Sequence, residues 1–113
     1  MSNKEKFAYT PSPPYYSVIF TSERTEKDQG YADMAERMKE LAKQQDGFLG
    51  MESAKENIGI TVSYWKNLES IKKWKMNTEH IAAQQKGRST WYKHYKIRIC
   101  LVERDWEFDE KKL

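Results

Sequence analysis

Two consecutive segments, Ile60-Thr61-Val62-Ser63-Tyr64-Trp65 and Lys66-Asn67-Leu68-Glu69-Ser70-Ile71, decide the fold of this chain. The first alternates with period two, which predicts a β-strand. The second begins an amphipathic helix that Asn67 is expected to cap. The predicted apolar stripe of this helix consists of Leu68, Ile71, Trp74 and Thr78. The helix either continues to about Lys86 or breaks at Asn77-Thr78, and Gly87 is expected to stop it.

The residues before this pair predict a strand and another helix. The segment Phe48–Ala54 forms a hairpin with the strand at 60–65, through the turn cluster at 56–59. Upstream, a helix is predicted from about Tyr31 to Gln45, with Asp28 near its start as a capping acid and Gly47 in a left-handed conformation after its end. Its predicted apolar stripe consists of Tyr31, Met34, Ala35, Met38, Leu41 and Ala42.

The first and last segments complete a sheet. Tyr15–Ser22 is rich in β-branched and aromatic residues, and Tyr95–Arg104 alternates apolar with polar side chains. The resulting order β-α-β-β-α-β predicts an α+β domain with a ferredoxin-like, four-stranded antiparallel sheet. Right-handed crossovers place both helices on one face of this sheet.

Length and composition fit one small domain. The chain has 113 residues and a net charge of +3 with the signs mixed. We expect a flexible N-terminal arm at 1–14, a single domain at 15–108 and a charged tail at 109–113. The single cysteine, Cys100, and the lack of a signal or membrane-spanning run favour a cytoplasmic protein without contact to a membrane.

The sheet face without helices still carries apolar side chains, among them Val62 or Tyr64 and Val102. A second copy is the simplest cover, so a homodimer joined sheet to sheet is expected. The same element order occurs in RNA-recognition domains, but the strand at 60–65 lacks their aromatic motif. Nucleic acid is therefore not expected as a partner.

The segments on either side of the hairpin have a family resemblance. Gly47-Phe48-Leu49-Gly50-Met51-Glu52 after the first helix, and the stretch Ile60–Ile71 followed by Trp74, resemble the antibiotic biosynthesis monooxygenase family over roughly residues 15–104. The resemblance implies a ferredoxin-like dimer whose sheets form an α+β barrel. It also implies a cofactor-independent monooxygenase acting on a small aromatic or quinol-like substrate. The alternative is a non-catalytic module, connected with stress, that binds heme or another hydrophobic ligand.

One branch of that family degrades heme. Its helix tryptophan matches Trp74, but the histidine that binds iron ten residues later is replaced by Gln84. The first strand also lacks the asparagine of that branch. Heme breakdown is therefore not expected. His80 and His94, fourteen residues apart, do not form a metal-binding spacing either.

The candidate site residues each have a functional and a structural interpretation. His80 is the candidate general base, although in a continuous helix it would point to solvent. Asn77 is the second catalytic candidate, or a surface residue. The substrate-binding candidates are aromatic rings for a flat ligand and a cation for an anionic oxygen, with core packing or solvent exposure as the alternative: Trp65, Trp74, Trp91 and Arg24.

Overall fold

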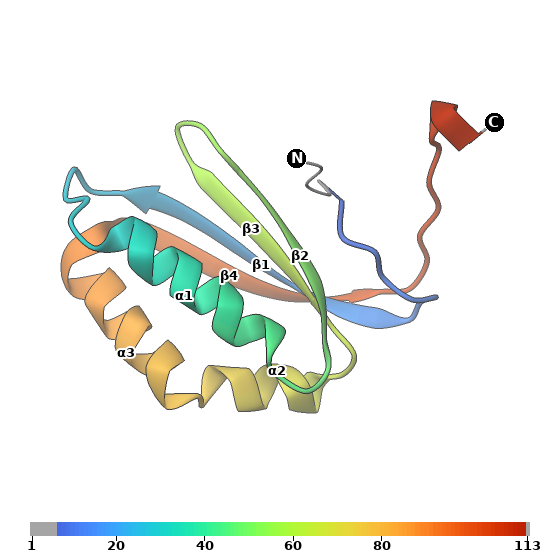
Figure 1. Ribbon diagram of the computed structural model, residues 1–113, viewed down its shortest axis with the longest axis horizontal. Coiled ribbons are helices and arrows are strands. Elements are labelled where there is room, and N and C mark those ends of the chain that lie inside the picture. Colours follow the sequence, from blue (N-terminus) through green and yellow to red (C-terminus); the bar gives the residue numbers. More distant parts are fainter. Residues whose placement is uncertain (1–6, 113) are drawn as a thin grey trace.

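The computed structural model describes residues 7–112 of the chain as one four-stranded antiparallel sheet with helices against one face (Figure 1). The strand order is β2-β3-β1-β4, so the predicted ferredoxin-like topology is confirmed. The elements follow in the order β1 (Tyr15–Arg24), α1 (Tyr31–Lys43), β2 (Phe48–Lys55), β3 (Gly59–Trp65), α2 (Leu68–Lys75), α3 (Thr78–Lys86) and β4 (Tyr92–Val102). Within the described residues, none of these helices is long and apolar enough to cross a bilayer.

The central strand β1 pairs antiparallel with β3 on one side and β4 on the other. A π-helical turn, Gly87–Trp91, leads into β4, which therefore begins at Tyr92 and not at Tyr95 as predicted. The strand ends at Val102, before Arg104. Tyr92, three residues before the predicted start, already pairs with Arg24.

The predicted second helix is two helices. The side chain of Asn67 accepts a hydrogen bond from the Ser70 amide and caps α2, as predicted. The side chain of Asn77 accepts one from the His80 amide and caps α3. The break expected as an option at Asn77-Thr78 is therefore present, and the sheet carries three helices on one face.

The start of α1 differs from the prediction. Gly30, with φ of 79°, occupies the N-cap position, and no side chain caps this helix. Asp28 instead pairs with Arg24 at 2.9 Å, so the expected capping acid serves an ion pair. Gly47 has φ of 86°, the left-handed conformation that the sequence predicts.

The core lies between the sheet and the helices. Trp65 is fully buried, and Leu41, Ala42 and Ile71 from the helices are nearly so. The prediction that Leu68 belongs to the buried stripe of its helix is wrong, because its side chain is 53% exposed. As the first residue of α2, it lies at the margin of the layer.

The helix layer leaves part of its own sheet face open. Leu101 pairs with Tyr16, which pairs with Trp65, so Leu101 lies on the same face as Trp65. By the alternation of side chains, Ile97 and Ile99 share that face. The three residues, called the β4 strip below, are 41–53% exposed. The expectation that the helices cover this whole face is therefore wrong along β4.

The opposite face, called the outer face below, is apolar in its middle. Side chains at alternate positions of β1, β3 and β4 are half-buried there: Ile19, Val62, Tyr64, Cys100 and Val102. The exposed cations Lys96 and Arg98 lie on the same face of β4, because their partners on β1 are Thr21 and Ile19. The outer face therefore combines an apolar middle with a basic margin.

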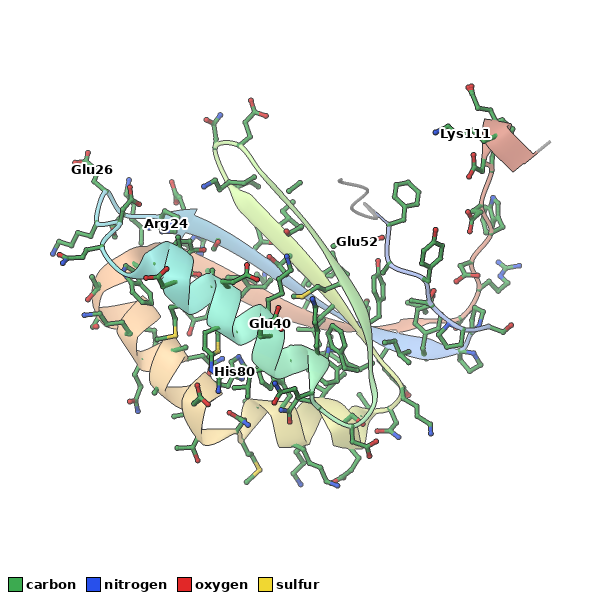
Figure 2. The ribbon with its side chains drawn as sticks, in the orientation of Figure 1. Arg24, Glu26, Glu40, Glu52, His80 and Lys111 are labelled. Atoms are coloured by element: carbon green, nitrogen blue, oxygen red, sulfur yellow. The ribbon has the colours of Figure 1, made fainter. Side chains whose placement is uncertain are left out.

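The segment before β1 and the segment after β4 both contact side chains of the outer face. In the N-terminal arm the Ala8 amide donates to Glu52, which also accepts from the Tyr64 hydroxyl at 2.7 Å (Figure 2). After β4, Asp105 accepts from the Tyr15 hydroxyl at 2.5 Å. Residues 1–6 of the predicted arm and residue 113 of the predicted tail lie outside the described residues.

Candidate functional site

Three rings from three elements form a stack on the helix side of the sheet. The ring of Trp74 in α2 stacks on that of Trp65 in β3, with centroids 6.1 Å apart and an interplanar angle of 27°. The His80 imidazole also stacks on the Trp74 ring, with centroids 4.1 Å apart and an interplanar angle of 12°. Trp65 is fully buried and its indole nitrogen donates to the Ser63 hydroxyl, so it anchors the stack from below.

His80 is turned inward and not toward solvent. The structural alternative for this residue assumed a continuous helix, but α2 ends at Lys75 and α3 begins a new helical phase at Thr78. Figure 2 places His80 in the space between α3 and α1. Its side chain is half-buried and packs on Trp74. The expectation of a solvent-directed His80 is therefore wrong, and the reason is the helix break.

The contacts of His80 define its tautomer. Its Nδ1 lies 3.0 Å from the carbonyl oxygen of Trp74. A carbonyl only accepts, so Nδ1 donates its proton, and the lone pair of the neutral ring is on Nε2. Burial lowers the pKa of His80, while the hydrogen bond to Trp74 opposes this less strongly. The ring is thus held in the neutral form that accepts a proton.

The side chain of Asn77 binds a backbone amide of its own helix. Its Oδ1 accepts from the His80 amide at 3.1 Å, so this side chain fixes the first turn of α3 and with it the position of the imidazole. The sequence suggested Asn77 as a catalytic group, and its observed contact is a helix cap.

Arg24 and Trp91 form a second cluster at the start of α1. The guanidinium of Arg24 stacks over the Tyr31 ring at 3.3 Å, and its Nε donates to the Trp91 carbonyl. Trp91 is 3% exposed, and its indole donates to the Gln29 carbonyl. The Tyr92 hydroxyl donates to that of Tyr31, and burial raises the pKa of Tyr92. All these groups have partners within the chain.

The two clusters lie apart. Figure 2 shows Arg24 beside the start of α1 and His80 lower down, between α1 and α3. Two open surface hollows lie near the helices, and neither is lined by Trp74 or His80. One, of about 500 Å³, is lined by Lys27, Asp28, Gln29, Lys86 and Thr90. The other, of about 330 Å³, is lined by Gly30, Asp33, Met34, Arg37, Glu79 and Ala82.

The β4 strip is a part of the site region that the sequence did not reveal. It shares a face with Trp65, from which Tyr16 of β1 separates it. At about 4.8 Å between neighbouring strands, Leu101 and Trp65 are roughly 10 Å apart. Exposed aliphatic side chains beside an aromatic stack can hold a flat apolar molecule. The alternation in β4 was visible in the sequence, but not the absence of a helix above it.

No cluster of potential metal ligands is present among residues 7–112. His94 is exposed near the start of β4 and lies on the face opposite to the helices, because it pairs with Glu23. Gln84 is half-buried in α3, four residues or about one helical turn after His80.

Sequence comparison connects the chain to proteins of a defined family. Residues 21–100 match the family described as monooxygenase af470-like. The uncharacterised protein YqjZ of Bacillus subtilis (strain 168) is 52% identical over 103 residues, which cover 89% of this chain and 90% of YqjZ.

Structural comparison shows the same fold in distant proteins. SnoaB, a cofactor-independent oxygenase from Streptomyces nogalater, aligns with a TM-score of 0.70 at 8% identity, over 82% of this chain and 97% of SnoaB. A candidate antibiotic biosynthesis monooxygenase from Nitrosomonas europaea aligns with a TM-score of 0.67 at 11% identity, over 83% of this chain and 94% of that protein.

Proposed function

Because this chain belongs to the monooxygenase af470-like family, we propose that it is a cofactor-independent monooxygenase of a small aromatic or quinol-like substrate. The resemblance to the antibiotic biosynthesis monooxygenases is confirmed by the family match and by the shared fold. The observation that carries the substrate class is the stack of Trp74 and neutral His80 on the sheet face that also carries the exposed β4 strip.

The proposed reaction begins with a proton transfer. Nε2 of His80 takes a proton from an acidic C–H or O–H group of the substrate, which becomes electron-rich enough to reduce dioxygen. Oxygen forms a bond to the substrate carbon, and the imidazolium returns its proton to the peroxide. Loss of water from this hydroperoxide leaves a carbonyl on the substrate. One oxygen atom is thus incorporated and the other leaves as water.

Each predicted site residue has a proposed place in this scheme. Trp74 stacks on the base and offers its edge to a flat ligand, and Trp65 supports Trp74 from the core. Asn77 is a positioning residue, because it holds the turn that carries His80. Arg24 and Trp91 shape the far end of the helix layer, where they are tied to Tyr31.

Oxygen uptake tests the enzyme proposal. Purified protein is mixed with a panel of anthrones and hydroquinones in an oxygen electrode, and the product is identified by mass spectrometry. We expect His80→Gln to lower the rate by about 10²–10⁴-fold. The exposed His94→Gln is the matched control and keeps the rate. Absence of uptake with every compound, or a fully active His80→Gln variant, contradicts the proposal.

A second candidate function is ligand binding without turnover. It is favoured by the internal hydrogen bonds of Arg24, Trp65 and Trp91, because these bonds occupy polar groups of three predicted substrate-binding residues. Titration with quinones and with heme, followed through quenching of the intrinsic tryptophan fluorescence, separates the two functions. Saturable binding without oxygen uptake supports the binding module, and binding with uptake supports the enzyme.

The proposed assembly is a homodimer through the outer face. The support is the half-buried apolar set Ile19, Val62 and Val102 at its centre. Burial of such a surface by a second copy is the usual twofold solution. Light scattering at micromolar concentration tests it, and a stable monomer contradicts it.

A further inference from the structure

The helix that carries His80, α3, offers little buried surface to the rest of the fold. None of its nine residues is buried, whereas α1 buries Leu41 and Ala42 and α2 buries Ile71. Helices in proteins gain most of their stability from the packing of an apolar face. Where α3 faces α1, an open hollow of about 330 Å³ is lined by residues of both helices. Apolar packing alone therefore fixes the position of α3 only weakly.

An ion pair bridges α1 and α3 beside this hollow. Arg37 of α1 donates two hydrogen bonds to Glu79 of α3, from Nε to Oε2 at 2.8 Å and from Nη2 to Oε1 at 2.6 Å. A bidentate pair fixes the orientation of its two groups as well as their distance. The other ion pairs among residues 7–112 join residues only three or four positions apart: Arg24–Asp28 and Glu40–Lys43. In the described part of the chain, Arg37–Glu79 is thus the ion pair that connects two helices.

The ion pair lies next to the imidazole, because Glu79 directly precedes His80 in the first turn of α3. The other contacts that place His80 are the cap by Asn77 and the stack on Trp74. Both are made within residues 74–80, so neither joins α3 to α1. Figure 2 shows His80 in the space between these two helices. Separation of α3 from α1 would therefore open the ring to water.

We propose that Arg37 and Glu79 are positioning residues: their ion pair holds α3 against α1 and so keeps the imidazole of His80 buried on Trp74. The catalytic consequence rests on the proposed function, but the placement of His80 can be measured without a substrate. Both charged side chains are 49% exposed. An exposed ion pair adds little to the stability of a whole domain. Its effect is therefore expected at α3, where few other contacts compete with it.

The pKa of His80 is the first readout. Burial lowers this pKa, and the hydrogen bond to the Trp74 carbonyl opposes this less strongly. A rise toward about 6.5, the value of an exposed histidine, therefore reports a loss of burial. Proton NMR of the histidine rings, recorded over a pH series, measures the pKa. The spectrum of His80→Gln assigns the signal, and the exposed His94 serves as the internal reference.

Two neutral variants, Arg37→Gln and Glu79→Gln, separate positioning from charge. Loss of a nearby cation raises the pKa of an imidazole, and loss of a nearby anion lowers it. A purely electrostatic role therefore shifts the pKa of His80 in opposite directions in the two variants. Loss of the ion pair raises it in both, because burial is the main cause of the lowered value. Arg37→Lys keeps the cation and should stay closer to the wild type than Arg37→Gln.

Lys43→Gln is the matched control, because it removes an exposed cation whose ion pair lies within α1. We expect it to keep the wild-type pKa of His80. Oxygen uptake is the second readout, and we expect kcat to fall about 10–100-fold in Arg37→Gln and Glu79→Gln. Their urea midpoints should stay close to that of the wild type, since α3 buries no residue.

Three results overturn the positioning role. They are an unchanged pKa of His80 in both test variants, shifts in opposite directions, and an equal rise in Lys43→Gln. A wild-type protein that takes up no oxygen overturns the proposed function alone, because the histidine titration does not depend on turnover.

Discussion

At the scale of single residues, His80 shows how a break between two helices changes the direction of a side chain. A histidine is a typical general base, but a helical wheel for one continuous helix directs the side chain of His80 to solvent. The cap at Asn77 restarts the helix and turns the imidazole onto Trp74. The sequence predicted a possible general base and a possible helix break at Asn77-Thr78. Whether His80 faces solvent or Trp74 is decided by the packing of α3, which the sequence does not show.

The buried position of His80 predicts a pH effect on stability. Its pKa is lowered in the folded protein, and an unfolded histidine has a pKa of about 6.5. Its contribution is therefore present above pH 6.5 and is lost as the pH falls through the folded pKa. We expect His80→Gln to reduce the slope of unfolding free energy against pH below 6.5, by at most about 1.4 kcal/mol per unit. Urea titrations measure this slope. The exposed His94→Gln is the matched control, and an equal change in both variants contradicts the assignment.

Gly47 joins α1 to β2 in a conformation that side chains rarely adopt. Its φ is 86°, and an added Cβ would lie 2.6 Å from Cβ of Ser70. We expect Gly47→Ala to lower the unfolding free energy by about 2 kcal/mol or more, from backbone strain plus the clash. Gly30→Ala separates the two causes, because its φ is 79° but its added Cβ would meet only the Trp91 ring, at an ordinary contact distance of 3.6 Å. Equal losses in the two variants would show that the contact with Ser70 is unimportant.

At the scale of elements, most of the strands and helices could be predicted, because hydrophobic periodicity is local. The hairpin β2-β3 and the helix at 31–43 follow directly from their patterns. The early start of β4 could not be predicted, because Tyr92 becomes strand through pairing with Arg24, far away in the sequence. The exposed β4 strip depends on where the helices lie, which is also a non-local property.

The two asparagine caps offer a matched pair of variants. Replacing Asn67 or Asn77 by Ala removes one capping hydrogen bond, with an expected loss of about 1 kcal/mol each. Only Asn77 positions His80, so Asn77→Ala should also slow oxygen uptake, and Asn67→Ala should not. Thermal unfolding and the oxygen electrode give the two readouts. Equal rates in both variants would refute the positioning role.

At the scale of the whole molecule, the hydroxyl groups of Tyr64 and Tyr92 connect segments that are distant in the sequence through hydrogen bonds. Tyr64 joins β3 to β2 and the N-terminal arm through Glu52, and Tyr92 joins β4 to α1 through Tyr31. The pKa of each phenol is raised, first by burial and then by its hydrogen bond. The fold therefore depends on both groups staying protonated.

Alkaline solution should accordingly weaken the fold. An unfolded tyrosine has a pKa of about 10, so the contribution of these phenols is present below pH 10 and is lost as the pH rises through the higher folded pKa. We expect the unfolding free energy to fall above pH 10, and less steeply in Tyr64→Phe and Tyr92→Phe. Denaturant titrations at increasing pH measure this, with phenolate absorbance as the monitor. A wild-type stability that is flat above pH 10 would contradict it.

The pairing of β1 with β4 has a consequence for folding during translation. During translation the hairpin β2-β3 can close as soon as it leaves the ribosome, and β1 can join β3. The other edge of β1 must wait for β4, which is made about seventy residues later and is its longest partner. Until then the nascent chain exposes an unpaired central edge. Slow codons or a chaperone would matter most in this interval, between the synthesis of α1 and that of β4.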